Sequence, residues 1–273
     1  MKPKWIIEDF APDNSFGALA DEVKRQGMEC ELIQYLPFQS GSYDIYDEKD
    51  CVIFQGSINL AQQLQRDKKW IPGMWLTPKN YECTKYYAHL GKYLFNSLYV
   101  MMPRAEVKRR MDWLYNECFG PYEQLFIRPN SGLKPFTAGL CSRLNFDYFW
   151  RWVDDFTEPE SIIVVSTPKV VKQEWRFICT KDGVLTGCQY EKSREFKTHP
   201  GYPEKAGALA AEVAATYQPD PIFVVDICLG ETDNYYLMEI GSFSVAGLYA
   251  CNMQPIVGRA SEIALKEWEE ENE

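Results

Sequence analysis

The sequence predicts a mixed α/β protein, on three observations. Strand-like and helix-like segments alternate through the first hundred residues, an order that is typical of a small parallel sheet. The dipeptide Asp182-Gly183 separates two strand-like runs and is a strong signal for an antiparallel hairpin. A second strand pair is expected at residues 222–227 and 235–240, joined by a short polar turn. The chain should therefore combine a parallel sheet with later antiparallel strands.

Length and composition narrow the class of protein further. The chain has 273 residues, 46% of them hydrophobic and 25% charged, which predicts a globular protein of two lobes or one large α/β unit. Its net charge of −10 argues against nucleic acids and anionic membranes as partners, because both repel an acidic surface. No run of about 20 apolar residues predicts a membrane span.

The cysteines and histidines point to a reducing compartment and away from several kinds of site. Nine cysteines are present and none forms a C-x-x-C pair, so free thiols in a cytoplasmic protein are expected. The opening residues, MKPKWIIEDF, carry acids where a signal peptide needs an apolar run. Two histidines leave little room for a histidine-rich metal site or a Ser-His-Asp triad.

The first hundred residues are expected to read strand, helix, strand, strand, helix. The predicted strands are 5–7, 30–35 and 51–54, and the predicted helices are 16–26 and 58–66. Asp13-Asn14-Ser15 could cap the first helix, and Gly27 would end it. Gly56-Ser57 precedes the second helix and is a plausible ligand edge, although such turns are common.

The remaining elements follow the same kinds of signal. A helix is expected near 84–93, and another from Pro103 to about Cys118, with the proline at the first helical position and Gly120 beyond the end. Further strands are predicted at 125–128, 161–165, 173–180 and 184–190, and further helices at 206–217 and 261–270.

Each strand of the late pair carries one carboxylate near its C-terminal end, Asp226 on the first and Glu239 on the second. A short turn between antiparallel strands can place two such positions side by side. The two charges then repel each other unless a cation lies between them. Mg²⁺ is the natural candidate, because it takes one or two carboxylates together with phosphate oxygens of a substrate. The alternative is that each acid marks a strand end that faces water.

Three cations earlier in the chain suit a polyphosphate beside such an ion. Arg128 ends a strand, Lys134 follows in a glycine-containing loop, and Arg176 lies within a third strand. Because side chains alternate along a strand, Arg176 shares its face with Glu174, and the neighbouring aromatic residues should be buried on the other face. Arginine offers a fork and lysine a point charge to phosphate oxygens. These residues therefore indicate a nucleoside triphosphate with magnesium.

The ordered segments FIRP with a following loop lysine, E-x-R, VVDI and LMEIGSFSVAGLY resemble the ATP-grasp superfamily. They resemble most closely the clade named for two arginines and a lysine, over about residues 103–249. The resemblance implies two lobes that clamp ATP, preceded by a small parallel-sheet α/β domain. The expected divisions are 1–98 for that domain, 99–160 for the first lobe and 161–273 for the second lobe with the metal site.

The resemblance also implies a role for individual residues. Arg128 matches a phosphate-binding position and Lys134 the loop over the phosphates. The stretch 166–171, which contains Lys169, matches the hinge that faces adenine, and Glu174 matches an acid on the nucleotide side. The catalytic candidate is Arg176, aimed at phosphate or acyl phosphate, and the magnesium ligands are Asp226 and Glu239. Tyr190 and Lys192 are weaker candidates for contact with the acceptor, and both could instead be plain strand-end residues.

One position departs from the family pattern. The family usually continues E-x-N, with the asparagine as a further ligand, whereas here the sequence is Glu239-Ile240-Gly241. Ser242, Ser244 or a water could substitute. The implied function is an ATP- and Mg²⁺-dependent ligase that joins a small-molecule or peptide carboxylate to an amine through an acyl phosphate. A non-catalytic nucleotide-binding module and a phosphotransferase are the alternatives.

Overall fold

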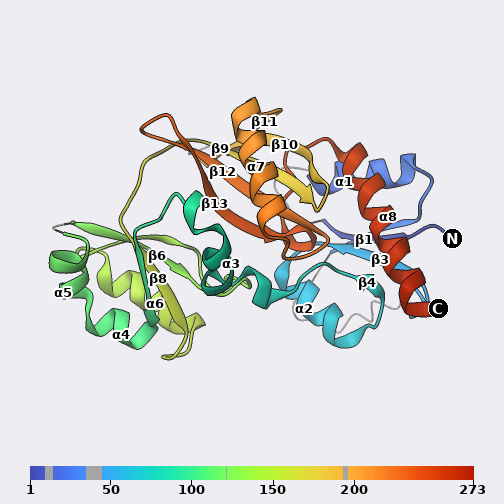
Figure 1. Ribbon diagram of the computed structural model, residues 1–273. Helices are drawn as coiled ribbons and strands as arrows, with labels where there is room; N and C mark the ends of the chain where they lie inside the picture. The colour runs from blue at the N-terminus through green and yellow to red at the C-terminus, as the bar shows by residue number, and fades with distance from the viewer. Residues whose placement is uncertain (10–14, 35–44, 121, 193–195) are drawn as a thin grey trace.

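The computed structural model describes residues 1–9, 15–34, 45–120, 122–192 and 196–273. It contains three sheets, and the five-stranded one lies between the other two (Figure 1). Both chain ends lie beside the parallel sheet (Figure 1). The predicted mixed α/β class is confirmed. Within the described residues, no helix has the length and hydrophobicity to cross a bilayer.

The first sheet is parallel, with strand order β2-β1-β3-β4. Its strands are β1 (Lys4–Glu8), β2 (Cys30–Ile33), β3 (Cys51–Gln55) and β4 (Ile71–Gly73), and its helices are α1 (Ser15–Arg25) and α2 (Ile58–Asp67). β3 is buried along its whole length, as expected of a central parallel strand covered on both faces. α2 begins after Ser57, whose hydroxyl accepts a hydrogen bond from the Leu60 N–H at 3.3 Å, a standard N-cap.

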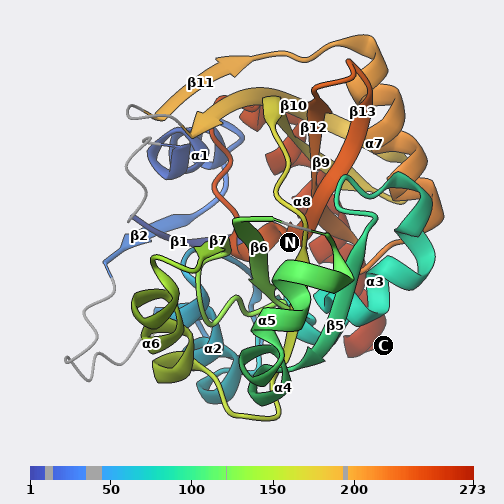
Figure 2. The same cartoon turned by 90° about the vertical axis from the view of Figure 1, so that its left-hand side faces the viewer.

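The second sheet is antiparallel, with order β5-β8-β6-β7, and forms what we call the first lobe (Figure 2). Its strands are β5 (Tyr99–Pro103), β6 (Gln124–Pro129), β7 (Gly139–Ser142) and β8 (Ile162–Ser166). Its helices are α4 (Arg104–Arg109), α5 (Met111–Trp113), the π-helical turn η3 (Leu114–Cys118) and α6 (Phe146–Phe156). Strand β6 carries Arg128 next to its last residue.

The third sheet is also antiparallel, with order β11-β10-β9-β12-β13, and forms the second lobe. Its strands are β9 (Val171–Thr180), β10 (Gly183–Lys192), β11 (Phe196–Pro200), β12 (Ile222–Gly230) and β13 (Tyr235–Ser242), with helix α7 (Glu204–Thr216) on one face. Gly183 has a φ of 115° in the β9–β10 turn, a conformation that glycine adopts without steric cost. The hairpin expected at this dipeptide is confirmed.

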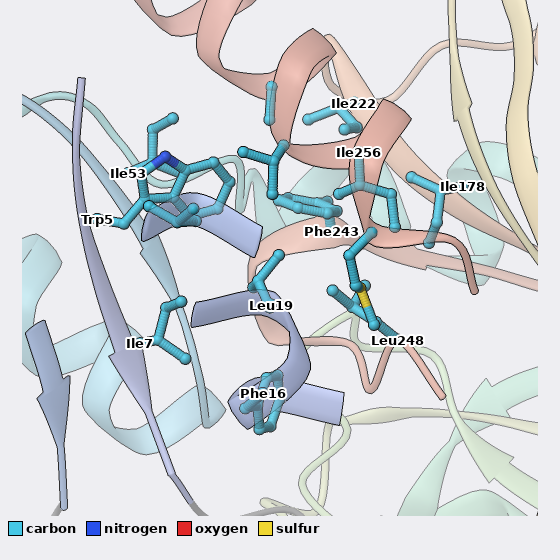
Figure 3. Packing of buried hydrophobic residues seen from close by; sticks show 14 of the residues in the cluster. Trp5, Ile7, Phe16, Leu19, Ile53, Ile178, Ile222, Phe243, Leu248 and Ile256 are labelled. Carbon is cyan, nitrogen blue, oxygen red and sulfur yellow. The ribbon is translucent and has the colours of Figure 1, made fainter. Parts of the chain in front are cut away.

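The end of the chain returns to the parallel sheet. After the short helix η4 (Phe243–Val245), helix α8 (Met253–Asn272) packs on α1, β3 and β4. A single apolar cluster joins Trp5 and Leu19 of the parallel-sheet region to Ile222 of the second lobe and Ile256 of α8 (Figure 3). The second lobe and the parallel sheet therefore share one core.

A linker of short helices connects the parallel sheet to the first lobe. It comprises η1 (Pro78–Tyr81), α3 (Cys83–Leu90) and η2 (Gly91–Tyr93). Tyr86 and Tyr87 of α3 pack with Val164 of the first lobe and Trp175 of the second. These tyrosines of the linker thus fill space between the two lobes.

Several element boundaries differ from the sequence prediction. Pro103 is not the first helical residue: it ends β5, paired with Ile162, and is the N-cap of α4, which begins at Arg104. The helical residues that follow are broken at Arg110 rather than continuous to Cys118. α8 begins eight residues before the predicted 261, because the Asn252 side chain caps it by accepting from Gln254 N–H at 3.1 Å. The predicted cap residues Asp13 and Asn14 lie outside the described residues.

The division at 98, 160 and 273 stays a prediction, and the sheets suggest two changes to it. Strand β8 follows the expected boundary at 160 but hydrogen-bonds between β5 and β6. α8, which the prediction placed in the second lobe, packs mainly on α1, β3 and β4 and also contacts β10. We propose that the first lobe extends through β8 and that α8 completes the N-terminal domain.

Candidate active site

The two late carboxylates are direct neighbours. Asp226 on β12 is the register partner of Glu239 on β13. The register shifts immediately afterwards, between Asp226 and Ile227, and such a bulge re-aims the side chains beside it. The adjacency expected from the short connecting turn is therefore present.

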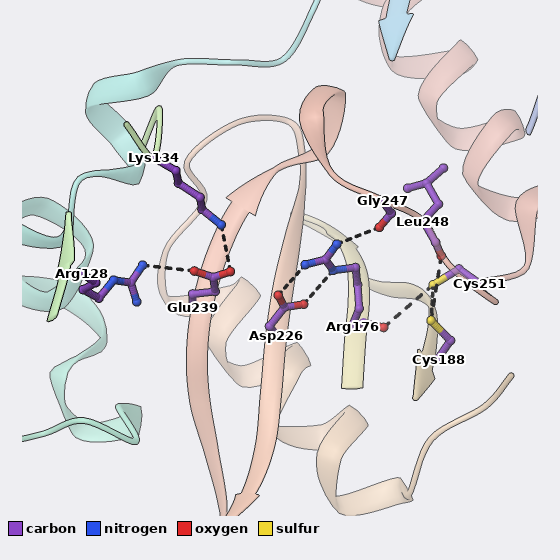
Figure 4. A network of polar contacts seen from close by, with 9 residues as sticks. All are labelled: Arg128, Lys134, Arg176, Cys188, Asp226, Glu239, Gly247, Leu248 and Cys251. Carbon is purple, nitrogen blue, oxygen red and sulfur yellow. Dashed lines mark hydrogen bonds and ion pairs between the residues drawn. The ribbon is translucent and has the colours of Figure 1, made fainter. Parts of the chain in front are cut away.

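Asp226 is engaged by Arg176 from the neighbouring strand β9, where it is the register partner. Arg176 Nε donates to Asp226 Oδ1 at 2.9 Å and Nη2 donates to Oδ2 at 2.7 Å (Figure 4). The residues are 7% and 1% exposed. A two-pronged pair of this kind fixes both side chains, so Arg176 orients the carboxylate at the back of the site.

Glu239 is engaged from the first lobe. Arg128 Nη2 donates to Glu239 Oε2 at 3.1 Å, and Lys134 Nζ donates to Oε1 at 2.9 Å (Figure 4). Arg128 lies one residue before the end of β6, and Lys134 lies in the loop beyond the strand. Glu239 of the second lobe thus binds both Arg128 and Lys134, the two residues of the first lobe that are predicted to contact phosphate.

Arg128 is held against the linker helix. Tyr86 and Tyr87 of α3 are buried beside it, and Asn130, two residues further on, accepts the Thr84 N–H at 2.7 Å through Oδ1. The Nε atom of Arg128 is buried and has no hydrogen-bond partner among the residues that the structure describes. Because such a donor is costly to leave unpaired, it fits an anion oxygen.

The Lys134 loop is packed closely onto the linker. A Cβ placed on Gly132 would lie 2.6 Å from Tyr81 Cβ and 2.7 Å from the Pro78 carbonyl oxygen. Lys134 itself has a φ of 47°, in the left-handed region that non-glycine residues seldom adopt. The close contact at Gly132 therefore determines where Lys134 is presented.

We expect Gly132→Ala to displace this loop. The added methyl group meets backbone and Cβ atoms that cannot swing aside, so the free energy of unfolding should fall by about 1–3 kcal/mol and nucleotide affinity should fall with it. Urea unfolding and calorimetry would measure the two effects. Gly91→Ala is the matched control, because nothing lies within 4 Å of a Cβ there. Equal stability of both variants would contradict this packing argument.

The segment Gly247–Cys251 closes the far side of Arg176. The Gly247 carbonyl oxygen accepts Arg176 Nη1 at 2.8 Å, and the Tyr249 ring lies 4.6 Å from the guanidinium carbon. Tyr249 has a φ of 52°, a strained conformation of a kind found at functional sites. Tyr190 packs against that ring at 5.2 Å between centroids, and burial raises the pKa of its phenol well above the usual value, which keeps it neutral.

A cavity of about 240 Å³ joins these groups. Its lining residues come from both lobes and from the N-terminal region, and include Ile58, Tyr81, Arg128, Lys134, Arg176, Asp226, Glu239 and Tyr249. Three cations and two carboxylates give a formal charge of 3 − 2 = +1. A larger groove of about 760 Å³ runs along α8, and none of the predicted site residues lines it.

Five of the seven predicted residues line the cavity, and two do not. Lys169 lies between β8 and β9, with its Nζ 5.5 Å from the centre of the Phe95 ring. Glu174 is half-buried between Tyr190 and Cys228 on the flanking strands. The side chain of Lys192 lies outside what the structure describes. The roles proposed for these three residues stay predictions, as do the roles of the five residues that line the cavity.

The missing asparagine ligand is not replaced by a free serine. The Ser242 hydroxyl donates to the Trp75 carbonyl at 2.6 Å, and the Ser244 hydroxyl accepts the Trp75 N–H at 3.0 Å. Both serines thus fasten β13 and η4 to the segment after β4. Among the described residues, no three His, Cys, Asp or Glu side chains lie close enough together to hold a metal ion without ligands from water or a substrate.

Sequence reasoning did not identify Gly247, Tyr249 or Tyr81 as part of this site. Gly247 and Tyr249 lie within the LMEIGSFSVAGLY segment that carried the resemblance, so a signal for them was available. Tyr81 lies 47 residues before Arg128 and carried no local signal, since its position depends on how the linker packs.

The fold is that of ATP-grasp proteins. Three of the solved structures that match it are D-cycloserine synthetase DcsG, the D-alanine–D-alanine ligase of Bacillus anthracis complexed with ATP, and the ATP-grasp ligase PsnB complexed with a phosphomimetic variant of a minimal precursor, Mg and ADP. For DcsG the identity is 12% and the TM-score 0.64, over 96% of this chain and 99% of that one. For the D-alanine ligase they are 11% and 0.57, over 99% and 100%. For PsnB they are 11% and 0.54, over 98% and 99%.

The sequence itself shows the family. Residues 109–257 match the ATP-grasp domain, R2K clade family 2. The chain therefore belongs to that ATP-grasp family, and the resemblance inferred from the motifs is confirmed. No curated protein sequence shows significant similarity to it.

Proposed function

We propose that this protein is an ATP- and Mg²⁺-dependent ligase that joins a carboxylate to an amine through an acyl phosphate. The observation that carries the proposal is the convergence of Arg128 and Lys134 of one lobe on Glu239 of the other, beside the Asp226–Arg176 pair. Family membership supports use of ATP. Three matching structures are named as a synthetase or ligases, two of them with ATP, or with Mg and ADP.

The ion pairs suggest how these residues receive a polyphosphate. Without nucleotide, Arg128 and Lys134 neutralise Glu239. When phosphates enter the cavity, both cations turn to phosphate oxygens, and the unpaired Nε of Arg128 gains an acceptor. Glu239 would then need a new counter-charge, which a divalent ion bound with the nucleotide would supply. Binding of the triphosphate is thereby coupled to binding of the metal.

The two carboxylates fit Mg²⁺, which takes one or two carboxylates and completes its shell with water and phosphate oxygens. Glu239 and Asp226 would hold it, with Asp226 kept in orientation by Arg176. Bound there, the ion would neutralise charge that develops on the transferred phosphoryl group. Gly241 leaves one family ligand unfilled, so water is expected at that place.

The remaining roles follow from position. The cavity of about 240 Å³ is below the roughly 300–1,000 Å³ of most ligand sites, so it suits the phosphate end, and the lobes must part to admit the base. Lys169 and Glu174 are proposed for the base and ribose side. Arg176 donates three of its five N–H groups to Asp226 and Gly247. The other two can donate to the reacting carboxylate or acyl phosphate. Small-molecule or peptide carboxylates and amines are the proposed substrates.

The test is release of ADP and phosphate in the presence of Mg²⁺, ATP and pools of carboxylates and amines, with mass spectrometry of the products. Formation of an amide with one ADP per bond supports the proposal. ADP with a stable phosphorylated product would identify a phosphotransferase instead. Nucleotide binding without any turnover across the pools would favour the non-catalytic alternative.

The non-catalytic alternative has one specific observation in its favour, the glycine at position 241. A Cβ added at this position would lie 4.0 Å from Val224 Cβ, so a side chain can be accommodated.

We expect Gly241→Asn to fold normally and to lower the Mg²⁺ concentration for half-maximal nucleotide binding roughly tenfold, since changes to the groups around a bound metal are worth about that much. Gly139→Asn, on β7, serves as the control. No change in Mg²⁺ dependence would place the metal away from Gly241.

A further inference from the structure

Two buried thiols touch each other behind the candidate site. Cys251 Sγ donates to Cys188 Sγ at 3.3 Å (Figure 4). Cys188 lies on β10 and is fully buried, whereas Cys251 follows η4 and is 6% exposed. All nine cysteines of the chain are free thiols. The contact joins residues that are 63 positions apart in the sequence.

Both thiols are attached to the part of the chain that holds Arg176. Cys188 is the register partner of Arg176, and Cys251 Sγ lies 3.9 Å from the Arg176 carbonyl oxygen. Cys251 also ends the Gly247–Cys251 segment, whose Gly247 carbonyl binds the Arg176 guanidinium. A bond between the two sulfurs would therefore fix this segment to β10.

The geometry suits a disulfide better than the other roles of paired thiols. Two sulfurs that ligate one metal ion lie further apart, because each metal–sulfur bond is about 2.3 Å long and a tetrahedral angle separates them. No third ligand from the described residues joins them in a metal-binding group. A disulfide needs an approach from 3.3 Å to about 2.05 Å, which a small shift of the Gly247–Cys251 segment supplies.

We propose that Cys188 and Cys251 are a redox-sensitive modification site, at which a peroxide forms a reversible disulfide that fixes the Gly247–Cys251 segment. One thiolate attacks a peroxide oxygen and breaks the O–O bond, which gives a sulfenic acid and water. The second sulfur attacks the sulfenic sulfur, and hydroxide leaves and takes up the remaining proton as water. Two thiols and one hydrogen peroxide become one disulfide and two waters, and the sulfurs lose two electrons to the peroxide.

The consequence for activity rests on the proposed function. Closing the sulfur–sulfur gap moves the segment that binds Arg176 by about an ångström, and displacements of that size cost up to roughly 100-fold in rate. Oxidation should therefore lower Mg²⁺-dependent ADP release, and dithiothreitol should restore it.

The test begins with the full-length wild-type protein, treated with hydrogen peroxide, alkylated and digested with trypsin without reduction. The expected product links peptide 182–192 to peptide 206–259. The second peptide also contains Cys228, so Cys228→Ser is the matched control and should keep the link, whereas Cys188→Ser should lose it. Hydrogen exchange of the amides at 247–251 should slow on oxidation and recover with dithiothreitol.

Absence of the link, a link through Cys228, or a mapped link without slower exchange at 247–251 would each overturn the proposal. The mass and exchange measurements need no nucleotide. A protein that forms the disulfide and slows exchange but never consumes ATP would therefore count against the proposed function and leave the redox site supported.

Discussion

Replacing Glu239 with glutamine is expected to reduce Mg²⁺-dependent ADP release about 100-fold, the upper part of the range for altered metal shells, and to strengthen binding of metal-free ATP. The two effects have opposite signs because the carboxylate has two tasks. It would hold the metal, and it also occupies Arg128 and Lys134 in the absence of nucleotide. Without its charge, the cavity changes from a formal +1 to +2, which attracts a triphosphate more strongly.

Calorimetry with ATP, in EDTA and then in Mg²⁺, measures both halves of this prediction. Glu212→Gln is the matched control, because Glu212 also contacts a lysine, Lys92, but lies on α7 with an exposed side chain. Weaker binding of ATP in EDTA by the Glu239 variant would mean that Arg128 and Lys134 are not the phosphate contacts.

Replacing Asp226 with asparagine is expected to destabilise the protein as well as to stop turnover. Asp226 neutralises a buried arginine through two hydrogen bonds, and asparagine keeps the shape without the charge. Leaving one member of a buried pair uncompensated costs about 3–5 kcal/mol, and we expect the lower end of that range here. Urea unfolding gives the stability, and turnover is measured below the temperature at which the variant unfolds.

Asp233→Asn provides the comparison for Asp226. Asp233 also pairs with a cation, Lys172, but its side chain is 77% exposed, so the loss should be within about 1 kcal/mol. If Asp226→Asn unfolds at the wild-type urea concentration, Arg176 has another counter-ion and the pair is not the anchor described above. If it keeps wild-type turnover, Asp226 does not hold the metal.

The sequence was informative where local patterns decide structure. Matched apolar runs joined by a short polar turn placed Asp226 beside Glu239, since a hairpin with a short connection has few possible registers. The glycine after Asp182 marked the other hairpin for a similar reason. The ordered motifs identified the family, because the order of the charged residues and the apolar strand segments between them can be read directly from the sequence.

The sequence was less informative where two signals competed. Pro103 ends β5, where it pairs with Ile162, and also caps α4, which begins at the next residue; only the helical signal was visible in the sequence. α8 begins earlier than predicted, at the Asn252 cap, and Ile256 and Val257 of its first turns are buried in the shared core, a burial that no local pattern reports. Strand β8 joined the first lobe because it pairs with β5 and β6.

By itself, then, the sequence determined the α/β class, the family and the neighbouring carboxylates, because each depends on periodicity or on residues a few positions apart. The tertiary structure alone decided that Arg128 meets Glu239 across 111 residues, that Gly247 and Tyr249 enclose Arg176, and that Cys188 touches Cys251. Such contacts arise from the packing of distant elements against a shared core, and chain-local patterns carry no record of which surfaces will meet.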